Sequence, residues 1–175
     1  LHLSVGGTIS TGGVGQRSFR CGLQIDNVLE LELIQENGNR LICSNSKNKA
    51  LFDRARGGYG QFGMISKVKM RLEAAPKQVL VYKAIYDNAN DFIQDQILLS
   101  AEYSVSAVQA HIVLNRREEI ERRIGQTLSN ENYSLLNDQS LWVFVLEISI
   151  YIYNPETLLS TKECQQEIFN RVLHC

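Results

Sequence analysis

A glycine-rich segment near the start of the chain constrains the fold more than any other feature. Residues 1–19 begin with a short apolar strand and continue into a stretch with five glycines, among which Ser4, Thr8 and Ser10 are interspersed. Glycine has no Cβ, so such a stretch can adopt positive φ and bring its backbone close to a ligand. Consecutive N–H groups can then form an anion-binding concavity. The segment indicates either a loop that binds a phosphorylated or polar cofactor or a plain tight turn.

The segment does not match the common nucleotide-binding motifs. It lacks the Gly-Lys-Ser/Thr of the phosphate-binding loop. Gly13-Val14-Gly15 begins like Gly-x-Gly-x-x-Gly, but Ser18 stands where the last glycine belongs. No helix is apparent after it, and the alternating apolar pattern of residues 28–34 predicts a strand instead. This order of elements argues against a Rossmann-type nicotinamide enzyme.

A second glycine-rich segment follows a short predicted helix at residues 48–55. Residues 56–66 contain four glycines, which require an irregular backbone. The alternating pattern from Ile65 to Leu72 then predicts a strand. Between the two glycine segments, Asn37-Gly38 is typical of a hairpin turn.

Three ordered motifs carry a family resemblance. They are Ser-Val-Gly-Gly-Thr-Ile-Ser at 4–10, Phe-Arg-x-Gly-x-Gln-Ile-x-Asn-Val-Leu-Glu-Leu at 19–31 and Gly-Gly-x-Gly-Gln-Phe-Gly-Met-Ile at 57–65. Together they resemble the FAD-linked oxidases of the vanillyl-alcohol oxidase and para-cresol methylhydroxylase (PCMH) superfamily, and most closely cytokinin dehydrogenase and its bacterial relatives. The resemblance is strong over residues 1–76 and weaker, though traceable, through residue 154.

The resemblance implies a fold, a cofactor and a reaction. The expected class is α+β, with the second subdomain of a PCMH-type FAD-binding domain at 1–76 and the start of an α+β substrate (cap) domain with an antiparallel sheet at 77–175. Family members use FAD to remove a hydride from a carbon next to an amine or hydroxyl, so a small-molecule amine or alcohol is the implied substrate. The two glycine segments should lie side by side, because both would form the wall of one flavin-binding site. The implied cofactor-binding residues are Ser4, Gly6, Gly7, Ser10, Gly13, Val14 and Ile65.

The same resemblance implies that the chain is a fragment. The first FAD lobe, with the histidine that bonds covalently to the flavin, would precede Leu1, and so would the catalytic aspartate. No catalytic residue is therefore expected in this chain, and any FAD would bind non-covalently, because none of its three histidines has a Gly-His-Ser context. The chain alone is expected to be inactive. The alternative is a non-catalytic remnant or interaction module that keeps the fold but neither binds FAD nor turns over.

Composition excludes several classes of partner. The net charge of −1 gives no indication of nucleic acid or an anionic membrane surface. No apolar run approaches the ~18–20 residues needed to span a bilayer. The four cysteines have no metal-ligand spacing, so no metal is expected, and free thiols favour a reducing compartment such as the cytoplasm. A targeting signal ahead of Leu1 would change the expected location.

The second half of the chain predicts alternating strands and helices. Strands are expected at 79–85, 106–114 and 141–153, helices at 91–102 and 116–124 and after Asn154, and a polar loop at 128–139. The even positions of the 141–153 strand are all apolar and should face a helical layer. In the 116–124 helix, Glu118–Arg122 and Glu119–Arg123 have the spacing of i, i+4 ion pairs on a solvated surface.

Glu147 is the candidate substrate contact. It lies with Ser149 and Tyr151 on the odd-numbered face of the same strand. In the resembled family this sheet covers the flavin ring, and Glu147 matches a glutamate of plant relatives, so it could face a substrate there. An ordinary solvent-facing glutamate on a half-covered sheet is the alternative.

Overall fold

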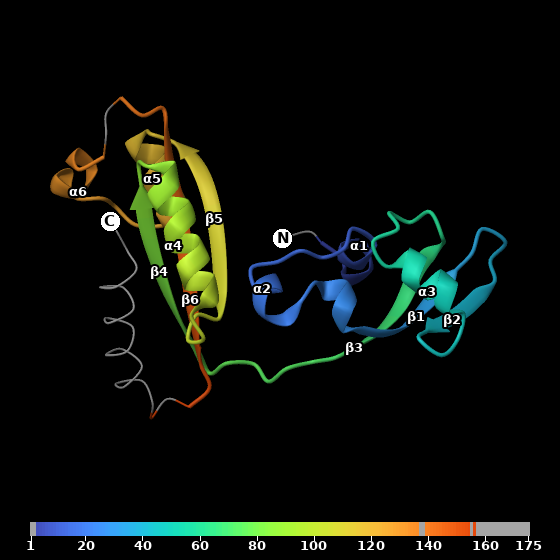
Figure 1. Cartoon of the computed structure of the whole chain (residues 1–175). Helices are drawn as coiled ribbons and strands as arrows, with labels where there is room; N and C mark the ends of the chain where they lie inside the picture. Colours follow the sequence, from blue (N-terminus) through green and yellow to red (C-terminus); the bar gives the residue numbers. More distant parts are fainter. Residues whose placement is uncertain (1–2, 137–138, 155, 157–175) are drawn as a thin grey trace. The chain divides into compact units, whose positions relative to one another are not determined.

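The computed structural model describes residues 3–136, 139–154 and 156 (Figure 1). The chain divides into two compact units, Leu1–Ala74 and Ala75–Cys175. Each unit combines helices with a three-stranded antiparallel sheet, which confirms the predicted α+β class. No helix among the described residues is long and apolar enough to cross a membrane.

The sheet of the first unit has the order β2-β1-β3. Its central strand is β1 (Val28–Ile34), which pairs with β2 (Arg40–Ser44) and β3 (Met64–Met70). The predicted hairpin turn joins β1 to β2, with Gly38 at a φ of 79°. The strand prediction for β3 was too long by two residues, because Leu72 lies beyond the strand and is 87% exposed.

Short helices occupy much of the first glycine segment, where a short apolar strand followed by a loop was expected. Ser4 caps α1 (Val5–Ser10) by accepting a hydrogen bond from the Gly7 N–H at 3.1 Å. The stretch after it, where the sequence predicted no helix, also contains α2 (Ser18–Cys21) and the 3₁₀ helix η1 (Gln24–Asn27). In α1 the local cap therefore outweighed the low helix propensity of two glycines.

The core of the first unit lies between its sheet and two helices. Leu31 and Leu33 of β1 are fully buried, as are Ile9 of α1 and Phe52 of α3 (Lys49–Ala55). Arg56 follows α3, and its guanidinium carbon lies 4.2 Å from the centre of the Phe52 ring. This packing holds α1 and α3 against the sheet and thereby fixes the ends of both glycine segments.

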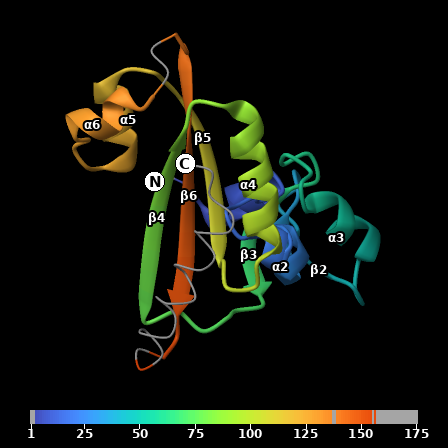
Figure 2. The same ribbon diagram turned by 60° about the vertical axis from the view of Figure 1, so that its left-hand side comes forward.

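The sheet of the second unit has the order β4-β6-β5. The central strand β6 (Trp142–Ile152) pairs along its length with β4 (Gln78–Tyr86) and β5 (Ala107–Leu114), so the predicted strands are confirmed to within about two residues at each end. Figure 2 shows α4 (Ala89–Ala101) running along this sheet, with α5 (Arg117–Ile124) and α6 (Asn130–Ser134) near one end of it.

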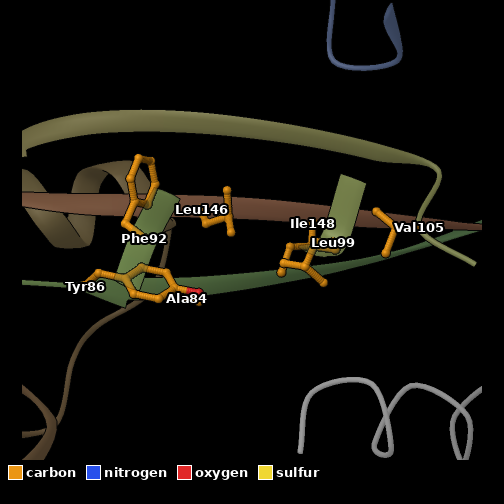
Figure 3. Close-up of a cluster of buried hydrophobic side chains, with 7 residues drawn as sticks. All are labelled: Ala84, Tyr86, Phe92, Leu99, Val105, Leu146 and Ile148. Carbon is orange, nitrogen blue, oxygen red and sulfur yellow. The ribbon is translucent and has the colours of Figure 1, made fainter. Parts of the chain in front are cut away.

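The even-numbered face of β6 packs against α4, as its apolar pattern predicted. Asn88 caps α4 by accepting from the Asn90 N–H at 2.8 Å. Phe92 stacks on Phe144 with ring centroids 5.0 Å apart. Figure 3 shows the buried side chains of this cluster, which are Ala84, Tyr86, Phe92, Leu99, Val105, Leu146 and Ile148.

The odd-numbered face of β6 is partly covered by α5. Three expectations about this part of the chain are corrected. Ile120 and Ile124 pack on Val143 and Val145, so α5 is not simply a solvated helix. Its ion pair joins Glu119 to Arg122 at 2.9 Å, with i, i+3 spacing in place of the expected i, i+4 pairs. The expected loop at 128–139 contains α6. The helix predicted after Asn154 lies outside the described residues.

Candidate functional site

Backbone hydrogen bonds join the two glycine segments within the first unit. The N–H of Gly57 donates to the carbonyl oxygen of Ile9, and the N–H of Tyr59 donates to that of Ser10, both at 2.9 Å. The two segments therefore lie side by side, as a shared cofactor wall requires. The carbonyl groups at the end of α1 are satisfied by this contact, which explains why the helix can stop there.

A cavity of about 1240 Å³ opens between these segments and the β1–β2 hairpin. Hydroxyl and amide groups line it together with apolar side chains, and Glu36 contributes a carboxylate. The lining residues are Ser4, Gly6, Gly7, Ser10, Ile34, Gln35, Glu36, Leu51, Gly60, Gln61, Phe62, Gly63, Met64, Ile65 and Ser66. Such a wall can contact both the flat apolar surface and the polar edges of a ligand.

Most of the candidate cofactor-binding residues line this cavity, and two do not. Ser4, Gly6, Gly7, Ser10 and Ile65 are in the lining, whereas Gly13 and Val14 are not. Those two residues lie elsewhere on the first unit. The structure thus brings together residues from α1 and from the start of β3.

Gly13 and Val14 belong to the turn after α1. Gly13 has a φ of +66°, and its carbonyl oxygen accepts from the Gln24 N–H at 3.0 Å. A Cβ on Gly13 would lie 2.4 Å from Gln24 Cβ, so the close approach of Gln24 by itself requires glycine there. Val14 is 80% exposed.

Two glycines in the cavity wall are explained by close packing. A Cβ on Gly6 would lie 3.2 Å from the carbonyl oxygen of Ile65, so the bare backbone lets α1 approach β3. Gly63 has a φ of +129°, and its Cβ would lie 2.8 Å from the carbonyl oxygen of Ile34. Gly60 differs, because a Cβ there would meet no heavy atom within 4 Å.

Sequence reasoning missed the contribution of the β1–β2 hairpin. Ile34, Gln35 and Glu36 reach the cavity because the sheet register places Ile34 beside Met64 at the start of β3. This pairing joins residues far apart in the chain, and no local motif encodes it. Leu51 was visible only as an apolar residue of a short helix.

A charged network fixes the cavity residue Ser66. Its hydroxyl donates to Glu32 Oε1 at 2.8 Å, and the Glu32 carboxylate also faces Lys67 and Arg40 at 3.3 and 3.7 Å. The Ser66 hydrogen bond is the main factor that lowers the pKa of Glu32, and Lys67 and Arg40 lower it further, while burial opposes them. Glu32 therefore remains an acceptor and holds the Ser66 hydroxyl in one orientation.

Glu147 lies in the second unit and is paired with a lysine. Its Oε2 is 3.6 Å from Lys83 Nζ, which also donates to the carbonyl oxygen of Ile124 at 2.7 Å. The Glu147 and Lys83 side chains are 21% and 24% exposed. Glu147 is thus a half-buried ion-pair partner. The described residues contain no group of three or more His, Cys, Asp or Glu suited to a metal ion.

Comparison with known proteins identifies the relatives of this chain. No family model matches it. Cytokinin dehydrogenase 10 from Oryza sativa subsp. japonica is 34% identical over 172 residues, which cover 93% of this chain and 31% of the relative. Cytokinin dehydrogenase 1 from Arabidopsis thaliana is 33% identical over 159 residues, which cover 89% and 28%. The chain belongs to the cytokinin dehydrogenase family. It spans about a third of the length of these relatives.

Solved structures show that this cytokinin dehydrogenase homologue has the fold of vanillyl-alcohol-oxidase-type flavoproteins. Alkyldihydroxyacetonephosphate synthase matches with a TM-score of 0.65 and 16% identity over 95% of this chain and 31% of that one. A berberine bridge enzyme variant, described as a reticuline dehydrogenase, matches at 0.60 with 21% identity over 95% and 29%. Glucooligosaccharide oxidase from Acremonium strictum matches at 0.61 with 16% identity over 97% and 30%.

Proposed function

We propose that this cytokinin dehydrogenase homologue is part of an FAD-dependent oxidoreductase that removes a hydride from a carbon next to an amine or hydroxyl. The observation that carries the proposal is the cavity in which the two glycine segments meet. In this proposal residues 1–76 form part of the FAD-binding domain, and residues 77–175 form part of the substrate domain. Bound FAD would supply the hydride acceptor.

The cavity suits a group such as FAD in size and in chemistry. Small-molecule cavities are typically about 300–1,000 Å³, so a cavity of about 1240 Å³ has room for a large cofactor. Gly60 leaves its backbone open to the cavity, since a Cβ added there would have no heavy atom within 4 Å. Ser4, Ser10 and Ser66 offer hydroxyl groups to the polar edges of a ligand.

The residues that would hold FAD in this chain are Ser4, Gly6, Gly7, Ser10 and Ile65, with Gly13 and Val14 retained as predictions outside the cavity. Gly6 and Gly7 would contact the cofactor through bare backbone, and Ile65 through its backbone at the start of β3. Such backbone contacts would orient a flavin without the use of charged side chains. Attachment in this chain would be non-covalent.

Glu147 is the proposed substrate contact of the second unit. Its carboxylate is held by Lys83 at 3.6 Å, so it would meet a substrate with a defined orientation. An amine substrate would be attracted to this carboxylate. Cytokinins are the first substrates to test, because the curated relatives are named for them.

The test is anaerobic reduction of bound flavin in the complete protein. Loss of the oxidised flavin absorbance on adding a cytokinin or another amine or alcohol supports the proposal. A complete protein that carries no flavin after gel filtration, and is not reconstituted by added FAD, supports the alternative of a non-catalytic interaction module that keeps the fold. The chain of residues 1–175 alone is expected to bind FAD weakly or not at all.

A further inference from the structure

Four ionisable side chains gather on the odd-numbered face of the second sheet. Glu147 of β6 lies opposite Lys83 of β4 and Gln109 of β5, and His111 follows two residues after Gln109 on the same face. Arg123 reaches this face from α5. The cluster therefore joins all three strands to one helix.

The contact between Arg123 and His111 favours one protonation state of the histidine. The Arg123 Nη2 atom contacts His111 Nε2. A guanidinium group can only donate hydrogen bonds, so Nε2 has to be the acceptor. This arrangement favours a neutral His111 that carries its proton on Nδ1.

The surroundings of His111 favour this neutral state. Burial is the main factor that lowers its pKa from the ordinary value of 6.5, and the positive charges of Arg123 and Lys83 lower it further. The carboxylate of Glu147 opposes them. Within the described part of the chain, these three side chains are the charged groups that face His111 from α5, β4 and β6.

The last turn of α5 depends on the same cluster for its polar contacts with the sheet. Besides the Arg123–His111 contact, the carbonyl oxygen of Ile124 accepts from Lys83 Nζ at 2.7 Å. Arg123 Nε is buried without a hydrogen-bond partner among the described residues. The guanidinium is thus incompletely satisfied, and losing His111 as an acceptor would remove a contact that it needs.

We propose that His111 is a proton-sensitive latch that fastens the end of α5 to the sheet. When Nε2 takes up a proton, it changes from acceptor to donor, and the imidazolium lies beside the Arg123 cation. Both changes oppose the contact, so Arg123 leaves His111 and the last turn of α5 loosens against β5, while Ile120 and Ile124 still pack on β6. The imidazolium then pairs with Glu147, the carboxylate on the same face.

The latch would also alter the proposed substrate contact, a consequence that rests on the function proposed above. Loosening of the last turn of α5 frees Lys83 from the carbonyl of Ile124, and pairing with His111 gives Glu147 a second cation. Acidification would then weaken the attraction of Glu147 for an amine substrate. The latch itself depends only on the second unit, so it can be tested without cofactor or substrate.

The test is an NMR titration of the chain of residues 1–175. The chain has three histidines, and the ring signals of His111 are assigned by their loss in His111→Gln. We expect His111 to titrate below 6.5, and the backbone amides of Arg123 and Ile124 to shift with the same midpoint. Titration of His111 at or above 6.5, or α5 amides that do not follow it, would overturn the latch.

Two variants separate the latch from general effects of charge. Arg123→Gln removes the cation next to His111 and is expected to raise the midpoint. Arg122→Gln removes the preceding cation, whose partner is Glu119 on the exposed side of α5. This variant is expected to leave the titration midpoint of His111 unchanged. His111→Gln keeps an acceptor for Arg123 but does not titrate, so the α5 amides should lose their shift in that range. Equal midpoints in both arginine variants would contradict the proposal, and its failure would leave the proposed oxidoreductase function untouched.

Discussion

The backbone N–H of Tyr59 donates to the carbonyl oxygen of Ser10 at 2.9 Å. This bond joins the second glycine segment to the end of α1 and closes one side of the cavity. Tyr59 has a φ of 52°, which is unusual for a bulky residue. The following Gly60 also has a positive φ, 78°, so the segment holds two consecutive residues in the left-handed region. The cavity wall thus depends on backbone conformation as well as on side chains.

Gly60→Ala should destabilise the first unit by about 1–2 kcal/mol, the typical cost of placing a Cβ in the left-handed region. No steric clash adds to this, because the added Cβ would meet no heavy atom within 4 Å. Gly15→Ala is the matched control, since Gly15 also has an open Cβ position and lacks a positive φ. Hydrogen exchange of β1 and β3 amides measures the difference. Equal exchange in the two variants would show that the backbone conformation of Gly60 is not constraining.

Gly7→Val should lower flavin content of the complete protein more than it lowers folding stability. Gly7 lines the cavity, and its added Cβ would lie 3.0 Å from the capping Ser4 Oγ. Because Gly7 is helical and has no positive φ, the strain that a left-handed glycine would add is absent. Thr8→Val is the control, because it places the same side chain in α1 outside the cavity lining. Flavin absorbance and thermal melting on the same samples decide the point, and parallel losses in both would mean that Gly7 is only structural.

The strands of this protein were predictable from sequence because their signals are local. The alternation of β6 identified a strand and the face that packs against α4, and the Asn37-Gly38 turn identified a hairpin. The helix α1 was not predicted, because two glycines concealed a helix that depends on the Ser4 cap and on Ile9 in the core. The glycine segments indicated the cavity, but its hairpin wall depends on pairing between distant strands. The partners of Glu147 likewise come from β4 and are set by sheet register.

Tyr86→Phe should destabilise the second unit by about 1–3 kcal/mol, the usual cost of removing one partner of a buried polar group. The Tyr86 hydroxyl donates to Asp95 Oδ2 at 3.0 Å, and Asp95, a residue of α4, is fully buried. Tyr153→Phe is the control, because the Tyr153 side chain is exposed. Urea unfolding can be followed by the fluorescence of Trp142, the single tryptophan, which lies in this unit. A Tyr86→Phe midpoint equal to that of the control would exclude the predicted contribution.

The second unit should lose stability as the pH falls below about 6.5. The folded state lowers the pKa of His111, mainly through burial, so the unfolded chain binds this proton more readily. Stability therefore rises with pH in this window and is complete above the unfolded value. The folded state also lowers the pKa values of Glu32 and Asp53. These two groups change stability only at pH values below their ordinary pKa values of 4.5 and 3.8, which lie outside the range in which His111 titrates. His111→Gln should flatten the pH dependence of the unfolding midpoint, followed by Trp142 fluorescence, between pH 5 and 7. An unchanged slope would assign this pH dependence to other groups.

Glu147→Gln should raise the KM of the complete protein for an amine substrate while flavin content stays unchanged. The amide keeps the size of the side chain but removes the negative charge that would attract a cationic substrate. Lys83 then loses its carboxylate partner but keeps the carbonyl oxygen of Ile124 at 2.7 Å, so the local fold has a remaining anchor. Glu118→Gln, on the exposed first turn of α5, removes an equal charge as the control.

The pattern across substrates distinguishes the two roles of Glu147. A direct contact predicts a larger rise in KM for an amine than for a neutral alcohol, because only the amine carries the charge that the carboxylate attracts. A purely structural ion pair with Lys83 predicts a lower unfolding midpoint with no difference between substrates. Steady-state kinetics with one substrate of each kind, together with urea unfolding of the same preparations, measures both quantities. Equal KM values for wild type and Glu147→Gln with the amine would remove Glu147 from the substrate site and leave it as the partner of Lys83.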